Sequence, residues 1–260
     1  MSRRAGRVAR SVVVPVVGTA AIVGAAWAYT ESTASVYVQP LPTMLKSFGD
    51  TWFFEHFSSD LLPSVVHVVA GFIVAVVVGV SLGILLGSSR TLRLMAEPVI
   101  SLLRSVPVPA LVPPAAVAFG LGDDMRIGVI ALGCLWPILL NTMDGMGEID
   151  PLIVDTARSY RITGARRLLW VTLPALGPRI AGACRISLSI GLLAMVISES
   201  IAASSGIGFF LLNSQNLFRI DWMWAAILML GLLGVVLNLG LTAIERRWLR
   251  WYFRAQAAAN

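Results

Sequence analysis

The chain has 260 residues, of which 57% are hydrophobic and only 13% are charged, and its mean hydropathy is +0.81. Soluble domains carry roughly 25% charged residues, so this composition excludes a soluble enzyme or a soluble binding module. It predicts an all-α polytopic membrane protein. We assign the net charge of +6 to membrane topology rather than to nucleic-acid binding, because basic residues gather in the cytoplasmic loops of such proteins.

The N-terminal part is predicted as a basic tail, residues 1–10, followed by a first transmembrane helix, residues 11–29. The basic start and the small residues at 25–28 would also fit a cleaved signal peptide, but the length of the apolar run favours a retained helix. Residues 30–60 mix charged and aromatic side chains. They suit an extracytoplasmic segment at the membrane interface, either an interfacial helix or a plain outer loop.

Five further apolar segments follow, at about 61–87, 94–119, 127–146, 180–198 and 222–244. We therefore expect about six transmembrane helices, five of them in one membrane domain at 61–250, with a short tail at 251–260. Glycines spaced four and eight residues apart in the segment 61–87 predict close helix packing. The segment 94–119 contains four prolines between 107 and 114, which predict that a regular helix does not continue there.

The distribution of basic residues predicts the topology. With the N-terminus inside, the outer segments hold only Lys46, Arg126 and Arg219, whereas the inner segments hold fifteen arginines. Positive charge is concentrated on the cytoplasmic side of membrane proteins. Both termini and the loop at 147–179 are therefore expected in the cytoplasm.

The segment 155–174 in this loop begins with an acidic residue, is basic along its length and ends at a proline. Its apolar residues at 168–170 and its central glycine predict two short helices with a turn between them. It resembles the loop that defines the permease subunits of binding-protein-dependent ABC importers, whose pattern is Glu-Ala-Ala, three residues, Gly, nine residues, then Ile-x-Leu-Pro. Arg161 occupies the usual glycine position, and the glycine follows three residues later.

This resemblance implies that the segment docks on a separate ATPase subunit and couples it to transport. The residues assigned to this ATPase-coupling site are Asp155, Thr156, Ala157, Arg158, Arg161, Gly164, Leu173 and Pro174.

Charged residues within membrane segments are candidates for function, because their burial is costly. Arg104 and Arg185 either reach toward the cytoplasmic headgroups or line the space between helices and pair with acids, and Glu97 could pair with Arg104 along one helix. Glu199, followed by Gly-Ile-Gly, resembles the family and is expected near an outer gate. The candidates for a transport pathway or gate are Arg104, Pro107, Pro109, Arg185 and Glu199.

The stretches at 105–109 and 182–185 resemble the branch of the family that imports sulfonates, taurine, nitrate and related small anions. The resemblance implies a multi-pass subunit of the bacterial cytoplasmic (inner) membrane that forms the pathway for a small solute. Its expected partners are a dimer of ABC ATPase subunits, an extracytoplasmic substrate-binding protein, membrane lipid and a second permease copy, most simply in a homodimer.

The chain itself is not expected to be an enzyme. Its one lysine, Lys46, lacks the glycine-rich run of a phosphate-binding loop, so ATP and Mg²⁺ would bind to the partner ATPase. The sequence Gly-Leu-Gly-Asp at 120–123 matches intramembrane aspartyl proteases, but no earlier span supplies the second aspartate. No catalytic residue, cofactor or metal site is predicted. The alternative function is an ATP-independent secondary transporter or channel, which would need more intramembrane acids.

Overall fold

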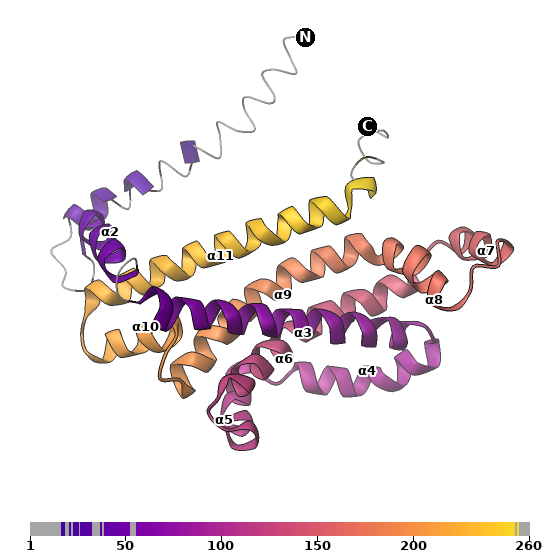
Figure 1. Cartoon of the computed structure of the whole chain (residues 1–260), viewed down its shortest axis with the longest axis horizontal. Helices are drawn as coiled ribbons and strands as arrows, with labels where there is room; N and C mark the ends of the chain where they lie inside the picture. The colour runs from indigo at the N-terminus through magenta and orange to yellow at the C-terminus, as the bar shows by residue number, and fades with distance from the viewer. Residues whose placement is uncertain are drawn as a thin grey trace, which may run out of the picture. The chain divides into compact units, whose positions relative to one another are not determined.

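The computed structural model describes residues 17, 18, 21, 23–25, 27–32, 37, 39–52, 56–252 and 254, which are almost entirely helical (Figure 1). They fall into a main unit, Phe57–Phe210 with Leu230–Asn260, and a small unit, Met1–His56 with Leu211–Met229. The predicted basic tail 1–10 and much of the predicted first span 11–29 lie outside the described residues.

The described residues contain four helical stretches long and apolar enough to cross a membrane, or five if a strongly bent pair counts as one span. All five correspond to the apolar segments predicted after residue 60, which confirms an all-α polytopic protein. The helices that build them are α3 (Leu62–Gly87), α4 (Arg90–Arg104), α5 (Val108–Phe119), α6 (Asp123–Gly147), α9 (Leu173–Ala202) and α11 (Ile220–Trp248).

The bent pair consists of α4 and α5, whose axes differ by 91°. The chain leaves α4 at Ser105, and Pro107 is the N-cap of α5. Pro109 lies in the first turn of α5, where a proline removes no helical hydrogen bond. Whether Pro107 and Pro109 line a transport pathway remains a prediction.

The expectation that all four prolines interrupt the helix is wrong for Pro113 and Pro114, because α5 continues through both. A proline has no N–H group, so it cannot donate the helical hydrogen bond to the carbonyl four residues earlier. Pro113 and Pro114 therefore leave two carbonyls without a helical donor. Both carbonyls belong to exposed residues, Pro109 and Ala110. The helix therefore tolerates these two prolines, and the sharp break occurs only between Ser105 and Pro107.

Helices α3 and α6 pack closely because α3 presents glycines to α6. A Cβ atom added at Gly83 would lie 2.6 Å from the Cβ of Thr142 and 2.8 Å from the carbonyl oxygen of Leu139. Small residues at such positions let two helix backbones approach in the membrane. The four glycines with such contacts, in order, are Gly71, Gly79, Gly83 and Gly87, which face Ile130, Ile138, Thr142 and Met146.

Helix α9 packs against the other side of the core through polar contacts with α6. The hydroxyl of Ser187 donates to the carbonyl of Cys134 at 2.8 Å, and the thiol of Cys134 donates to the carbonyl of Ser187 at 3.2 Å. Gly191 leaves room for the Cys134 sulfur, which would lie 2.7 Å from a Cβ there. Interhelical hydrogen bonds of this kind add to packing in lipid. Helices α3, α6 and α9 thus form the core of the main unit.

The part of α11 in the main unit is much less covered. Leu233, Glu245 and Leu249 are buried, whereas most of the apolar side chains between them are exposed. An apolar helix face on a membrane protein needs lipid or another helix against it. This face is therefore available for contacts beyond the described residues.

The small unit contains α2 (Leu41–Asp50), which begins after Pro40, and is held by indole hydrogen bonds. Trp52 is buried and its Nε1–H donates to the carbonyl of Ala225 at 3.0 Å. The indole of Trp224 likewise donates to the carbonyl of Tyr37 at 2.9 Å. The aromatic residues noticed in the sequence thus include one that anchors this unit, while the predicted interfacial location stays a prediction.

Candidate functional site

The predicted coupling segment consists of two short helices, as the sequence indicated. Helix α7 (Pro151–Ser159) begins at the N-cap Asp150, whose carboxylate accepts a hydrogen bond from the Leu152 N–H at 2.8 Å. Such a side chain satisfies one of the unpaired N–H groups of a helix N-terminus. Helix α8 (Gly164–Arg167) follows and continues through a π-helical turn, η3 (Leu168–Thr172), into α9.

The turn after α7 explains what the unusual Arg161 does. The Ile162 N–H donates to the Ala157 carbonyl, and the Arg161 N–H donates to the Arg158 carbonyl, each at 2.9 Å. This pair of bonds is the Schellman motif, which requires a left-handed residue at the position of Arg161. Arg161 has φ +53°, so the backbone takes a conformation that glycine adopts most readily, although an arginine stands there. Gly164, with φ +58°, makes a second left-handed turn.

The other residues of the predicted coupling site lie along the same helices. The hydroxyl of Thr156 donates to a carbonyl one turn earlier at 2.7 Å, and Asp155 pairs with Arg158 at 3.7 Å on an exposed face. Leu173 and Pro174 form the first turn of α9, where proline is well tolerated. These contacts account for the local helices and leave the outer face of the segment open.

The exposed surface of this segment carries large apolar and aromatic side chains among its arginines. Tyr160 is 76% exposed and Trp170 is 79% exposed, and Leu152 of α7 and Leu169 of η3 are exposed as well. Ala157, in contrast, is buried. Exposed large apolar side chains at several positions of one segment indicate a contact with lipid or with another protein.

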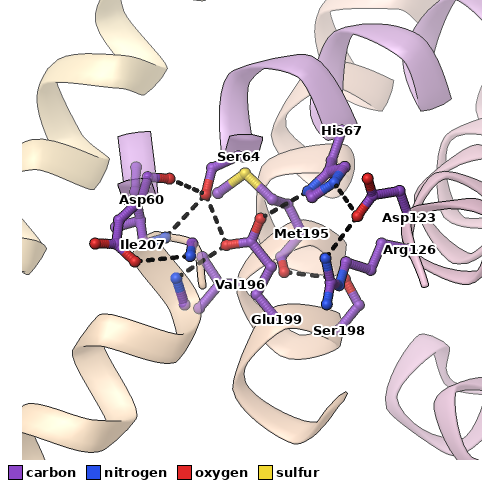
Figure 2. A network of polar contacts seen from close by, with 12 residues as sticks. Asp60, Ser64, His67, Asp123, Arg126, Met195, Val196, Ser198, Glu199 and Ile207 are labelled. Atoms are coloured by element: carbon purple, nitrogen blue, oxygen red, sulfur yellow. Dashed lines mark hydrogen bonds and ion pairs between the residues drawn. The ribbon is translucent and has the colours of Figure 1, made fainter. Parts of the chain in front are cut away.

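Glu199 lies at the centre of a buried polar network in the main unit (Figure 2). Its carboxylate has no exposed surface and accepts from the Ser64 hydroxyl at 2.8 Å and from the Gly208 N–H at 3.0 Å. Its other oxygen lies 3.1 Å from Nδ1 of His67. A buried carboxylate is tolerated when hydrogen bonds of this kind replace its hydration.

The same network holds the turn between α9 and α10 (Ile207–Asn216). The carboxylate of Asp60 accepts from the Gly206 N–H at 2.9 Å, and the Ser64 hydroxyl accepts from the Ile207 N–H at 2.8 Å. Gly206 has φ +109°, and a Cβ there would lie 2.5 Å from a carboxylate oxygen of Glu199. Only glycine fits this position, so the Gly-Ile-Gly sequence is explained by its packing against the buried carboxylate.

On the other side, the network reaches the start of α6. Nε2 of His67 lies 3.1 Å from Oδ1 of Asp123, and the same oxygen accepts from Arg126 at 2.8 Å. Figure 2 shows these groups in one chain of contacts. Asp123 thus contacts a histidine and an arginine. An intramembrane aspartyl protease would instead need a second aspartate beside it.

Sequence reasoning selected Glu199 but missed Asp60, Ser64 and His67. A signal was present: these three residues are four and three positions apart, so they share one face of a helix in an otherwise apolar segment. The structure places all three against Glu199 or its neighbouring turn. The predicted gate role of Glu199 remains a prediction.

For Arg185, two interpretations had been left open, and the structure shows a pairing with an acid. Its Nε donates to Oε2 of Glu245 on α11 at 3.0 Å, and its Nη2 contacts the same oxygen. Glu245 is 7% exposed, so the pair joins α9 to α11 at a buried carboxylate.

Arg104 differs, and its suggested pairing with Glu97 is wrong, because the salt bridges of the described residues include none between them. The two are seven positions apart, about 10 Å along a helix. Arg93 on the same helix instead pairs with Asp144 of α6 at 2.5 Å. Arg104 lines a small cavity of about 200 Å³ together with these three residues. Its place in a pathway stays a prediction.

Comparisons with known proteins match nearly all of the main unit. Residues 58–250 match the family described as the inner membrane component of binding-protein-dependent transport systems. The chain is 29% identical over 211 residues to the taurine transport system permease protein TauC of Escherichia coli, covering 81% of this chain and 75% of that protein. It is 33% identical over 190 residues to the bicarbonate transport system permease protein CmpB of Synechococcus elongatus, covering 73% and 68%.

Among solved structures, the chain is similar to a chain of the inward-facing MetNI methionine ABC transporter, with a TM-score of 0.65 and 18% identity. The match covers 73% of this chain and 94% of that chain, and it supports the fold alone. The family match spans the core helices, the coupling segment and the buried network. The chain therefore belongs to the family of inner membrane components of binding-protein-dependent transport systems, as a permease subunit.

Proposed function

We propose that this permease subunit imports a small solute that bears an oxyanion group and that a substrate-binding protein delivers, driven by a separate ATPase that docks on residues 155–174. The observation that carries the docking role is the exposed apolar face of this segment, with Trp170 and Tyr160 more than three quarters exposed. Membership of this family argues against the alternative function, which was a self-contained secondary transporter or channel.

The substrate class is proposed from the relatives. TauC is a taurine permease protein and CmpB a bicarbonate permease protein by name. Taurine carries a sulfonate, so both solutes present an oxyanion. The sulfonate, taurine and nitrate branch expected from the sequence shares this chemistry, and bicarbonate extends it.

The proposed mechanism assigns ATP hydrolysis and solute transport to different subunits. ATP and Mg²⁺ bind to the partner ATPase, and the coupling segment transmits its closure to the membrane helices. A ligand or partner shifts a conformational equilibrium only through contacts that differ between the two states. The contacts of Leu169 and Trp170 with the ATPase are therefore expected to differ between the resting and ATP-bound transporter.

A second copy of the permease is proposed to complete the pathway. The exposed face of α11 supports this arrangement, because an apolar helix face must meet lipid or another helix. A homodimer is the simplest assembly, since one type of chain then supplies both halves.

The double substitution Leu169→Asp/Trp170→Asp tests the docking role. It places two charges in the proposed apolar contact, and we expect at least a tenfold loss of ATPase subunit co-purified with the tagged permease from native membranes. Burying unpaired charge in an apolar contact is strongly unfavourable. The permease itself should still reach the membrane, because both side chains are exposed.

The matched control is Arg254→Asp, which changes an exposed residue of the C-terminal tail and should leave co-purification within about twofold of wild type. Wild-type amounts of ATPase on the double variant would contradict docking through this face. A wild-type chain that never brings down an ATPase, even with crosslinker and an ATP analogue, would contradict the partner itself.

A further inference from the structure

The salt bridge between Arg185 and Glu245 occupies only part of the arginine. Nε and Nη2 both contact Oε2 of Glu245, whereas Nη1 makes no hydrogen bond within the described part of the chain. The exposed fraction of the Arg185 side chain is 51%, against 7% for Glu245. The guanidinium therefore keeps an open edge inside an apolar span, where an unused charge is costly.

Arg185 lines an open groove of about 640 Å³ between α9 and α11. The groove extends from Arg185 along both helices to Leu192 on α9 and Gly231 on α11. A Cβ at Gly231 would meet nothing within 4 Å. The groove is thus open space beside the helices rather than a packed contact.

Two further polar side chains line this groove, Ser189 on α9 and Asn238 on α11. Ser189 lies one helical turn beyond Arg185, and Asn238 lies about two turns before Glu245. Both are exposed, and neither side chain makes a hydrogen bond among the described residues. The hydroxyl and the amide, with the open edge of the guanidinium, all offer hydrogen-bond donors. The rest of the wall is apolar, formed by residues such as Ile186 and Val235.

This set of donors suits an oxyanion. A guanidinium binds carboxylate, phosphate and similar groups through two parallel N–H bonds, and the hydroxyl and amide can donate to the remaining oxygens. The apolar wall can accommodate the carbon part of an alkyl sulfonate. A cationic solute would be repelled by Arg185.

We propose that Arg185, Ser189 and Asn238 form an anion-binding station in the transport pathway, at which Arg185 exchanges the carboxylate of Glu245 for the oxyanion of the substrate. This proposal rests on the proposed import of small oxyanion-bearing solutes. The exchange explains why the arginine can stay in the membrane between transport events, since Glu245 neutralises it. It also keeps binding weak, because the substrate must displace Glu245, and a transport site has to release its solute.

The test uses cells that express the whole transporter with its ATPase and binding protein. Uptake of ³⁵S-taurine, ¹⁴C-bicarbonate and ¹⁵N-nitrate first shows which of these oxyanion-bearing solutes the wild type carries. The variant Arg185→Gln/Glu245→Gln removes the charge without leaving either partner buried and unpaired. We expect it to lose at least tenfold in uptake while still co-purifying with the ATPase. Asn238→Leu and Ser189→Ala should each lose several-fold.

Two variants separate an anion site from a purely structural ion pair. Glu245→Gln removes the competing carboxylate, so the anion site predicts a several-fold lower KM for uptake, whereas a structural pair predicts only damage. The charge swap Arg185→Glu/Glu245→Arg rebuilds the pair with reversed positions. The anion site predicts that uptake stays lost in this swap although the complex assembles.

Arg250→Ala, at an exposed position just after the end of α11 and outside the groove, is the control and should transport normally. Recovery of uptake in the charge swap, or normal uptake by the neutral double variant, would overturn the anion station while leaving the proposed function intact. If the wild-type transporter carries none of the three solutes, the proposed substrate class fails and the station fails with it.

Discussion

At the scale of single residues, the turn after α7 shows that an arginine can hold a left-handed backbone conformation that usually requires glycine. Arg161 takes a left-handed conformation that a residue with a Cβ adopts at a cost of about 1–2 kcal/mol. The Schellman hydrogen bonds from Arg161 and Ile162 hold it there. The backbone geometry of the coupling segment therefore does not depend on a glycine at this position.

Arg161→Gly is expected to stabilise this turn. Glycine removes the strain of the left-handed conformation, and after its larger entropic loss the net gain is about 1 kcal/mol, or roughly fivefold slower local opening. Hydrogen–deuterium exchange of the peptide containing the amides of residues 161 and 162 measures this directly. Gly164→Ala is the opposite case, since φ is +58° there, and it should speed local exchange by a similar factor. Faster exchange in Arg161→Gly would show that the arginine side chain, not the turn, holds this segment.

At the scale of the elements, the meshing of α3 with α6 rests on glycines that allow no side chain. One of the closest approaches is at Gly83, where a methyl group would collide with the backbone oxygen of Leu139 as well as with Thr142. Backbone cannot move aside as a flexible side chain can, so the helices themselves would have to separate.

Gly83→Ala should therefore destabilise the protein by about 1–3 kcal/mol, the usual cost of overpacking a well-packed contact. Gly182 is the matched control, because it also lies within a membrane helix but has nothing within 4 Å of a Cβ. Gly182→Ala should be neutral or slightly stabilising. Thermal unfolding in detergent compares the two, and equal midpoints would mean that α3 and α6 do not pack as closely as described.

Much of this arrangement could be predicted from the sequence, because apolar segments and glycine spacing are local patterns. Pro107 was correctly predicted to break a helix, but the same was wrongly expected of Pro113. A proline inside a helix is tolerated where the carbonyl that loses its hydrogen bond is exposed, and that exposure depends on packing. The polar face of Asp60, Ser64 and His67 could have been noticed in the sequence, but its pairing with Glu199 was out of reach for a similar reason. Its partner His67 is 132 positions away in sequence, and only the packing of α3 beside α9 brings the two together.

At the scale of the whole molecule, the main unit combines a tight core of three helices with a sparsely covered α11 and an exposed coupling segment. The family match, residues 58–250, covers nearly all of this unit. Its orientation in the membrane still rests on the distribution of arginines, which predicts that residues 151–174 lie in the cytoplasm and the turn at 120–122 outside.

Cysteine labelling tests this orientation, and the chain is suited to it because both native cysteines, Cys134 and Cys184, are buried. Leu121→Cys should react with a membrane-impermeant maleimide in intact cells, since Leu121 is exposed on the predicted outer turn. Trp170→Cys, in a permease expressed without the ATPase proposed to cover this residue, should react only after the membrane is permeabilised. The reverse pattern would invert the topology, and labelling of the wild type would reveal that a native cysteine is accessible.

The glycine contacts of α3 have a consequence for movement. Two helices meshed at four successive positions can neither slide nor rotate against each other without first separating, and the paired hydrogen bonds between Cys134 and Ser187 restrain α9 in the same way. Packed contacts of this kind move together in conformational changes. The three core helices should therefore travel as one rigid body through the transport cycle. The relative motion must then be taken up elsewhere, first of all at α11, whose link to the core is the pair of Arg185 and Glu245 that we propose to be exchangeable.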